Sequence, residues 1–572
     1  MSSSTSNGLQ AHDLNWFVFG GSLTEWFLLF VIVALLMYGV WWSTSPFLNR
    51  PPMITNSLHL SLLTLGITFW LLTARFNSFP SFTLFKSNLL YDDFSMKVSL
   101  VLVASTIVCL LMSREYLENE KILFFEYSVL ILLSCLGGCW LVASYDFFTM
   151  YLTIELLSLP LYALASIKSR SLLSTEAGLK YFILGAFSSG VFLFGVSLLY
   201  LATGSLSFSE IGQLAPAMNI ADIQVQDCAY LMGMFMVLVG LLFKLTAAPF
   251  HMWAPDVYEG APTPVTAYFS IVPKLAVFAI TVRIVYVSFF DLSLEWQKAI
   301  TVCAIGSMIL GTLGAMSQKL DLKRLLAYSA IGNAGYMLLG VSSGTLEGLQ
   351  GLLLFAMIYI VMTMNAFATI LALKPRSTGI AIMSKSFHWQ RDTQNMRHMY
   401  LTGSNKSSDP HKVDQVSVSS DTNTWLEESY TPRHYTILTQ NSLGSLKGIL
   451  QFRTISKTNP LLAISIAFVF LSMAGVPPLA GFLGKMYLFF AAVDGGLYLA
   501  VFVGIAMNVV ASFYYIRCIK LAYFDGTKEW ISLGECSKEI SLILGLTIFF
   551  ISFFFLYPST TILWVSNAAA VL

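Results

Sequence analysis

Long apolar runs dominate the chain, and short polar or Pro/Gly-containing clusters separate them. Each run is about twenty residues long, which is the length of an α-helix that crosses a bilayer. The strands of a membrane β-barrel would instead alternate apolar and polar positions over about ten residues. The pattern therefore predicts an all-α membrane protein with about 14 transmembrane helices. They are expected near residues 22–42, 57–74, 96–113, 123–143, 147–167, 177–202, 229–268, 269–290, 297–316, 324–341, 349–372, 459–493, 497–519 and 540–566.

The composition agrees with this membrane assignment. Of 572 residues, 56% are apolar and only 11% are charged, and the mean hydropathy is +0.71. Soluble domains carry about 25% charged residues, so there are too few charges here to solvate two or three soluble domains. The net charge is +1, which gives no reason to expect a nucleic-acid partner. A soluble enzyme and a nucleic-acid-binding protein are both excluded, and membrane lipids are the expected surroundings.

One polar stretch interrupts the membrane pattern at residues 376–458. It separates eleven predicted spans in residues 1–375 from three in residues 459–572. It holds four of the seven histidines, but their spacing is too irregular for a metal-ligand cluster. We interpret the stretch as a solvated insertion, and no metal site is predicted.

Basic residues distinguish the two faces of the membrane. Loops that follow odd-numbered spans carry Arg50, Arg114, Lys121, Lys168, Arg170, Lys319, Lys323, Arg324, Arg517, Lys520 and Lys528. Loops that follow even-numbered spans carry mainly Arg75, Lys86, Lys97 and Lys298. Since Lys and Arg gather on the cytoplasm-equivalent face, the odd loops and residues 376–458 are expected there, with both termini on the opposite face.

Five charged residues lie deep inside predicted spans: Glu155, Lys180, Lys244, Lys274 and Lys485. A charge at the bilayer centre costs about 2.5–3.5 kcal/mol on insertion scales, so such residues persist when they pair, hydrate or perform a function. Burial lowers the pKa of a lysine and raises that of a glutamate, and a neighbouring opposite charge reverses each shift. Lysines and a glutamate that gain and lose each other as partners can therefore relay protons. No redox-cofactor or nucleotide motif appears, so the energy source is expected on another chain.

Prolines interrupt two of the predicted spans, the seventh and the twelfth. The seventh contains Pro249 and Pro255 after Lys244, and the twelfth contains Pro477 and Pro478 before Lys485. Proline removes a backbone donor and clashes with the preceding turn, so both helices should break inside the membrane. Spans seven and twelve cross in opposite directions, and paired broken helices of opposite direction indicate an inverted-repeat transporter.

Three further residues near the first break leave alternatives open. His251 follows Lys244 by seven residues and is either a packed core histidine or a member of the relay. Asp256 and Glu259 either cap backbone donors or take up protons, and the structural role is favoured.

Four motifs resemble the antiporter-like subunits of respiratory complex I, in the form found in plant and algal mitochondria. They are KYFILGAFSSG (180–190), FKLTAAPFHMWAPDVYEGAPTPVTAY (243–268), KRLLAYSAIGNAGY (323–336) and AGVPPLAGFLGK (474–485). The resemblance covers nearly the whole chain except about 376–446. It implies a proton channel built from Glu155, Lys180, Lys244, Lys274, Lys323 and Lys485. This chain departs from the family at Asn333, where relatives often carry a titratable histidine.

The resemblance also implies a place and partners. The chain would be a multi-pass protein of the mitochondrial inner membrane, with both termini on the intermembrane-space side. Its neighbours would be other complex I subunits, especially subunit 4L (K-type) and subunit 4 (M-type). No cofactor is expected in this chain, because NADH, FMN, iron–sulfur clusters and ubiquinone would belong to other subunits. Two alternatives remain: a subunit of a multi-subunit cation/proton antiporter, and a non-pumping structural scaffold.

Overall fold

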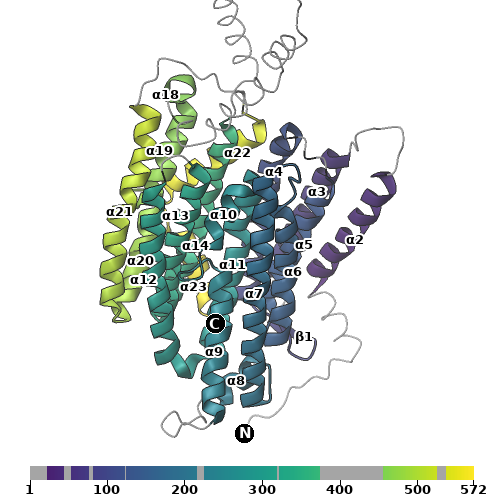
Figure 1. Ribbon diagram of the computed structural model, residues 1–572, viewed down its shortest axis with the longest axis vertical. Coiled ribbons are helices and arrows are strands. Elements are labelled where there is room, and N and C mark those ends of the chain that lie inside the picture. Colours follow the sequence, from purple (N-terminus) through teal and green to yellow (C-terminus); the bar gives the residue numbers. More distant parts are fainter. Residues whose placement is uncertain are drawn as a thin grey trace, which may run out of the picture. The chain divides into compact units, whose positions relative to one another are not determined.

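The computed structural model describes residues 22–43, 53–76, 81–120, 122, 124–214, 225–318, 321–373, 452, 455–524 and 536–571, and most of these residues are helical (Figure 1). Eleven helices in these ranges are long and apolar enough to span a membrane. The predicted all-α membrane class is therefore confirmed, whereas the count of fourteen spans stays a prediction. The long helices are α2 (Leu23–Ser43), α3 (Met53–Phe76), α4 (Asp93–Asn119), α5 (Glu126–Ala143), α6 (Phe147–Ala165), α7 (Leu172–Thr203), α9 (Val225–Lys244), α11 (Thr263–Val287), α12 (Ser293–Ser317), α13 (Leu322–Ser342), α14 (Leu346–Ala372), α19 (Pro460–Ala474), α20 (Ala480–Asp494), α21 (Tyr498–Tyr523) and α22 (Lys538–Phe553).

The chain divides into two compact units. The first comprises Met1–Ala372, Ile464–Ile519 and Ser537–Leu572, and the second comprises Leu373–Ala463 and Lys520–Cys536. Of the predicted insertion, only Phe452 and helix α18 (Ile455–Thr458) lie within the described residues.

Three helices, α11, α13 and α14, are enclosed by the others. Every residue of α11 from Thr263 to Val285 is buried, and nearly all of α13 and α14 is buried as well. α11 packs against α4, α5, α13 and α14. A helix that is apolar on every face belongs inside a bundle, so a charge on α11 or α13 is held by protein rather than by lipid.

The chain leaves its helical path at both proline-rich positions. α9 ends at Lys244, and eight residues separate it from the short helix α10 (Trp253–Gly260). α19 ends at Ala474, and α20 begins at Ala480. The indole Nε1 of Trp253 donates to the Phe243 carbonyl at 3.2 Å, which satisfies one of the backbone acceptors that the end of α9 leaves without a helical donor.

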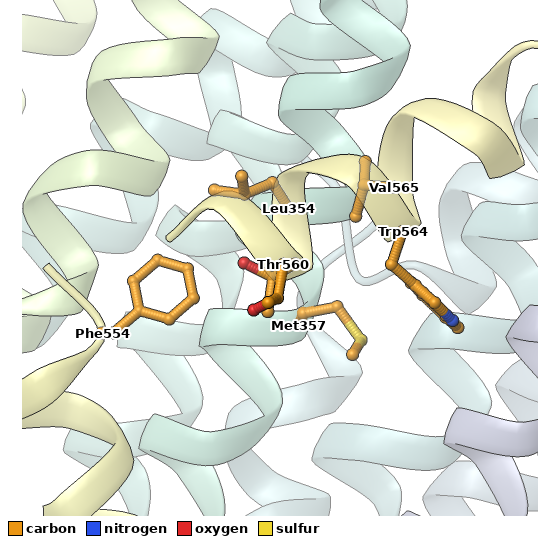
Figure 2. A pocket seen from close by; sticks show the side chains of 7 residues that line it. Leu354, Met357, Phe554, Thr560, Trp564 and Val565 are labelled. Carbon is orange, nitrogen blue, oxygen red and sulfur yellow. The ribbon is translucent and has the colours of Figure 1, made fainter. Parts of the chain in front are cut away.

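The last predicted span, residues 540–566, is not one helix, and on this point the sequence prediction is wrong. α22 ends at Phe553, and α23 (Ser559–Ala569) starts after Pro558. The reason is that the residue before a proline is driven out of the α region, here Tyr557. Figure 2 shows Phe554 and Trp564 beside this break, around a small apolar pocket that Leu354 and Met357 of α14 also line.

Three local features differ from the sequence prediction. A two-stranded antiparallel hairpin, β1 (Phe82–Leu84) and β2 (Leu89–Tyr91), and the helix α8 (Phe208–Leu214) lie where loops were expected. The eighth span begins at Thr263, six residues earlier than predicted. Pro264, in its first turn, has no N–H to leave unpaired and suits a helix start.

Two buried ion pairs connect neighbouring helices. Arg283 of α11 donates through Nη2 to both carboxylate oxygens of Asp92, at 2.7 and 2.8 Å, and its side chain is 1% exposed. Asp92 also caps α4 by accepting from the Ser95 N–H at 2.8 Å. The Arg75 guanidinium of α3 lies 3.5 Å from the Glu25 carboxylate of α2. These pairs show how this fold compensates a buried charge when the charge is structural.

Candidate functional site

Lys244 is the last residue of α9, so its side chain stands at the first break. Its ammonium donates to the hydroxyl of Tyr162, on α6, at 3.0 Å, and lies 5.6 Å from the centre of that ring. Lys244 forms no ion pair within the described part of the chain. The break thus leaves a half-buried ammonium against a neutral phenol.

Glu155 lies on α6, two helical turns before Tyr162 and on the same face of that helix. Its Oε1 is buried and accepts no hydrogen bond from any residue that the structure describes. The Ser158 hydroxyl lies between Glu155 and Tyr162 on this face of α6. It is buried and has no hydrogen-bond partner among the described residues. Glu155 and Lys244 therefore do not contact each other directly, although the relay predicted from the sequence relies on lysines and a glutamate becoming partners.

Lys274 lies in the middle of α11 and is 4% exposed. Its ammonium donates to the Ala330 carbonyl of α13 at 3.3 Å and lies 5.9 Å from the centre of the Tyr258 ring of α10. A small cavity beside Lys274 is lined by Tyr359, whose hydroxyl is buried without a partner among the described residues. The surroundings of this ammonium are again neutral.

Lys485 is the counterpart of Lys244 at the second break and is also 4% exposed. Its ammonium donates to the Met473 carbonyl at 2.7 Å and to Asn508 Oδ1 at 2.6 Å. Met473 belongs to the last turn of α19, where backbone carbonyls lack helical donors and attract a cation. One of the two acceptors of Lys485 is therefore a backbone carbonyl that the end of α19 leaves without a helical donor.

α13 passes both central lysines. Ala330 contacts Lys274, and the Tyr336 ring centre lies 5.1 Å from the Lys485 ammonium. Asn333 lies between them along the helix and is buried, with its Nδ2 unpaired among the described residues. Lys323, in the first turn of α13, donates to the Ala261 carbonyl at 2.8 Å. α13 therefore contacts two of the candidate relay lysines, Lys274 and Lys485, and carries a third, Lys323.

Lys180 belongs to an ion cluster at the end of α10. It lies 2.7 Å from Glu176 and 3.0 Å from Asp256. Arg324 of α13 pairs with Asp256 and with Glu259, each at 3.2 Å. The two acidic residues therefore hold α10 to α7 and α13 through ion pairs. Neither caps α10, whose N-cap is Met252, but the arrangement supports the structural role favoured for them.

His251 is half-buried in the turn that precedes α10. Because α9 stops at Lys244, the seven-residue spacing does not place the two side chains on one face of a continuous helix, so the spacing alone gives no support to a relay role for His251. No group of three His, Cys, Asp or Glu side chains suited to a metal ion occurs in the part of the chain that the structure describes.

Sequence reasoning missed the neutral partners Tyr162 and Asn508, and it assigned Arg324 only to a basic loop. A neutral polar side chain carries a weaker signal inside a membrane span than a charged one, so Tyr162 and Asn508 were not singled out from the sequence. The sequence did contain a signal for Arg324, because this charged residue follows Lys323 at the start of a helix, inside one of the four motifs.

The sequence of the chain is similar to sequences of known membrane proteins. A family model described as "NADH:quinone oxidoreductase/Mrp antiporter, TM" matches residues 144–399 and 436–511. NADH-ubiquinone oxidoreductase chain 2 of Marchantia polymorpha is 42% identical over 535 residues, which cover 94% of this chain and 95% of the relative. NADH-quinone oxidoreductase subunit N of Paramagnetospirillum magneticum is 36% identical over 552 residues, covering 96% of this chain and 97% of the relative.

A solved structure shares the fold along nearly the whole length. A chain of respiratory complex I from Thermus thermophilus, solved with bound aureothin, superimposes with a TM-score of 0.68 at 25% identity. The match covers 94% of this chain and 98% of that one.

Proposed function

This chain belongs to the NADH:quinone oxidoreductase/Mrp antiporter family, as the resemblance predicted, and we propose that it is a proton-translocating membrane-arm subunit of respiratory complex I. It is a multi-pass membrane subunit whose own residues move protons, while redox chemistry elsewhere in the complex supplies the energy. The proposed relay consists of Glu155, Lys180, Lys244, Lys274, Lys323 and Lys485.

One observation carries this proposal: the three inner lysines contact neutral oxygens rather than carboxylates. Lys244 meets a phenol, Lys274 a backbone carbonyl, and Lys485 a carbonyl and an amide. A buried charge that serves only the structure is normally paired with its opposite, as Arg283 is with Asp92. An ammonium held by neutral acceptors can release its proton without leaving a carboxylate behind. This favours a relay over a scaffold.

The proposed order along the membrane is Lys244, Lys274 and Lys485. α13 supports this order, because it contacts Lys274 and Lys485 in turn. Asn333 lies between these contacts and cannot titrate, so we assign it a bridging role in which its amide donates and accepts hydrogen bonds with water. Ordered waters with polar partners would complete each gap.

The partners and location follow from the same proposal. Subunits 4L and 4 would flank the chain in the mitochondrial inner membrane, and NADH, FMN, iron–sulfur clusters and ubiquinone would be bound by other subunits. The family's second branch, the Mrp antiporters, offers the alternative of cation/proton exchange without redox coupling. The test is to isolate the intact membrane complex from mitochondria through a tag on this chain. NADH:ubiquinone reductase activity that copurifies supports complex I, whereas a complex without it supports the antiporter alternative.

Orientation gives a separate prediction. Residues 376–458 should face the mitochondrial matrix. They follow the eleventh predicted span, and the loops that follow odd-numbered spans carry most of the basic residues. Protease added to mitoplasts, where only the outer face of the inner membrane is open, should leave this stretch uncut until detergent is added. Cleavage without detergent would overturn the proposed topology.

A further inference from the structure

Tyr162, whose hydroxyl accepts the hydrogen bond from the Lys244 ammonium, has no role in the relay proposed above. Tyr162 is buried, and its oxygen accepts from the Lys244 ammonium at 3.0 Å. Its ring meets Tyr181 of α7 edge-on, with centroids 4.6 Å apart. Tyr181 stacks on Trp253, which stacks on Phe243, the residue before Lys244. These four rings form an aromatic column that runs from Tyr162 of α6 through Tyr181 of α7 to Trp253 and Phe243, which lie after and before the first break.

The facing helix leaves room for this hydroxyl at one position. A Cβ atom at Gly185 of α7 would lie 2.1 Å from Tyr162 Oη and 2.6 Å from its Cζ. Any side chain larger than glycine would displace the phenol from the ammonium. The hydroxyl's position thus depends on residues from α6, α7 and α9 together.

Polar groups continue from the hydroxyl along one face of α6. Tyr162, Ser158 and Glu155 are spaced four and three residues apart, which places them one above another on a helix. Ser158 Oγ and Glu155 Oε1 are buried and unpaired within the described part of the chain. Buried polar atoms of this kind are normally satisfied by a partner or an ordered water. The face therefore offers a hydrogen-bonded route about 10 Å long between Lys244 and Glu155.

We propose that the Tyr162 hydroxyl carries the proton between Lys244 and Glu155, with Ser158 orienting the water between them; this rests on the relay function proposed above. The Lys244 ammonium gives one proton to the phenol oxygen while the phenol's own proton passes to a water bonded to Ser158. From that water a proton reaches the Glu155 carboxylate. The lysine ends as a neutral amine, the phenol and the water are regenerated, and the glutamate ends as a carboxylic acid.

The direct test is Tyr162→Phe in the intact complex, which removes one oxygen and keeps the ring in the aromatic column. We expect normal assembly and a fall in NADH-driven, proton-coupled turnover of about tenfold, the scale of a lost hydrogen bond to a charged group. The solvent deuterium isotope effect on the remaining turnover should increase, because proton transfer becomes slower. A purely structural hydroxyl would lower the amount of assembled complex without changing the isotope effect.

Tyr230→Phe is the matched control. Tyr230 is a buried tyrosine on α9 whose hydroxyl donates to the Ser288 carbonyl at 3.5 Å, about 20 Å along the helix from Lys244. This variant should keep both turnover and isotope effect. Normal turnover in Tyr162→Phe, beside a Lys244→Met variant that has lost it, would overturn the role of Tyr162 and leave the relay intact. Normal turnover in both would overturn the relay itself.

A second variant tests the same hydroxyl from the opposite helix. Gly185→Ala should also lower turnover, because the new methyl group displaces the phenol from Lys244. In the Tyr162→Phe background the same substitution should lower turnover much less, because the new methyl group still meets Cζ of the ring but no longer displaces a hydroxyl. Fully additive losses would show that Gly185 and the Tyr162 hydroxyl act separately and would contradict the proposal.

Discussion

Replacing Lys244 by methionine is expected to leave the complex assembled and to abolish most of its proton-coupled turnover. Methionine keeps much of the side chain's length and apolar volume but cannot hold a proton. Within the described part of the chain the ammonium donates to a phenol and to no carboxylate, so its removal strands no buried carboxylate there. We therefore expect a small effect on stability beside a fall in turnover of about a hundredfold, within the range assigned to a positioned proton-transfer group. Blue native electrophoresis reports assembly, and NADH oxidation in coupled vesicles reports turnover.

Lys298→Met is the matched control for this prediction. The Lys298 side chain is 71% exposed and, among the described residues, its ion pair is an i,i+3 pair with Glu295, so its loss should change neither assembly nor turnover. If Lys244→Met instead reduces the amount of assembled complex and leaves the turnover of each assembled complex normal, Lys244 is structural and the scaffold alternative gains support.

The opposite pattern is expected at Arg283. Arg283→Met leaves the buried Asp92 carboxylate without its cation, and breaking a buried pair from one side costs about 3–5 kcal/mol. That is a large fraction of the total stability of a domain, about 5–15 kcal/mol. The complex should assemble poorly or be lost, with no selective effect on proton coupling. The quantity to measure is the assembled complex per milligram of membrane protein.

Adding Asp92→Asn to Arg283→Met should recover part of the lost assembly. The asparagine side chain can still accept from the Ser95 N–H and cap α4, and it leaves no buried charge. A double variant that assembles no better than Arg283→Met alone would show that the guanidinium acts through contacts other than Asp92, such as the Phe94 ring 5.7 Å away.

Much of the fold could be predicted because the bilayer imposes a strong rule on sequence. A spanning helix needs about twenty apolar residues, so helices such as α4, α7 and α14 are visible as runs. Charges inside such runs are conspicuous for the same reason, which is how Glu155, Lys274 and Lys485 stood out.

The features that escaped prediction have weaker signals. The hairpin of β1 and β2 is only three residues per strand, too short for an alternating pattern. The break before Pro558 was missed, because the apolar composition continues on both sides of it and resembles one continuous span. Tyr162 is an uncharged residue in an apolar run, and its role depends on a gap opposite Gly185 that only three-dimensional packing creates.

Asn333 shows how sequence and structure combine. The sequence revealed that a titratable side chain is missing where relatives often carry histidine. The structure adds that Asn333 is buried on α13, between the residues that contact Lys274 and Lys485. An amide in that position can orient water but cannot hold a proton, so the proposed relay assigns proton storage to the lysines on either side.

The ratio of protons translocated to NADH oxidised, measured in proteoliposomes that contain the intact complex with Lys485→Met, tests the relay most directly. Lys485 is proposed as its terminal site, and its two hydrogen-bond acceptors are neutral, so the variant should assemble. We expect fewer protons per NADH than in the unmodified complex during the turnover that remains. An unchanged ratio at normal assembly would contradict the claim that this chain moves protons through its buried lysines.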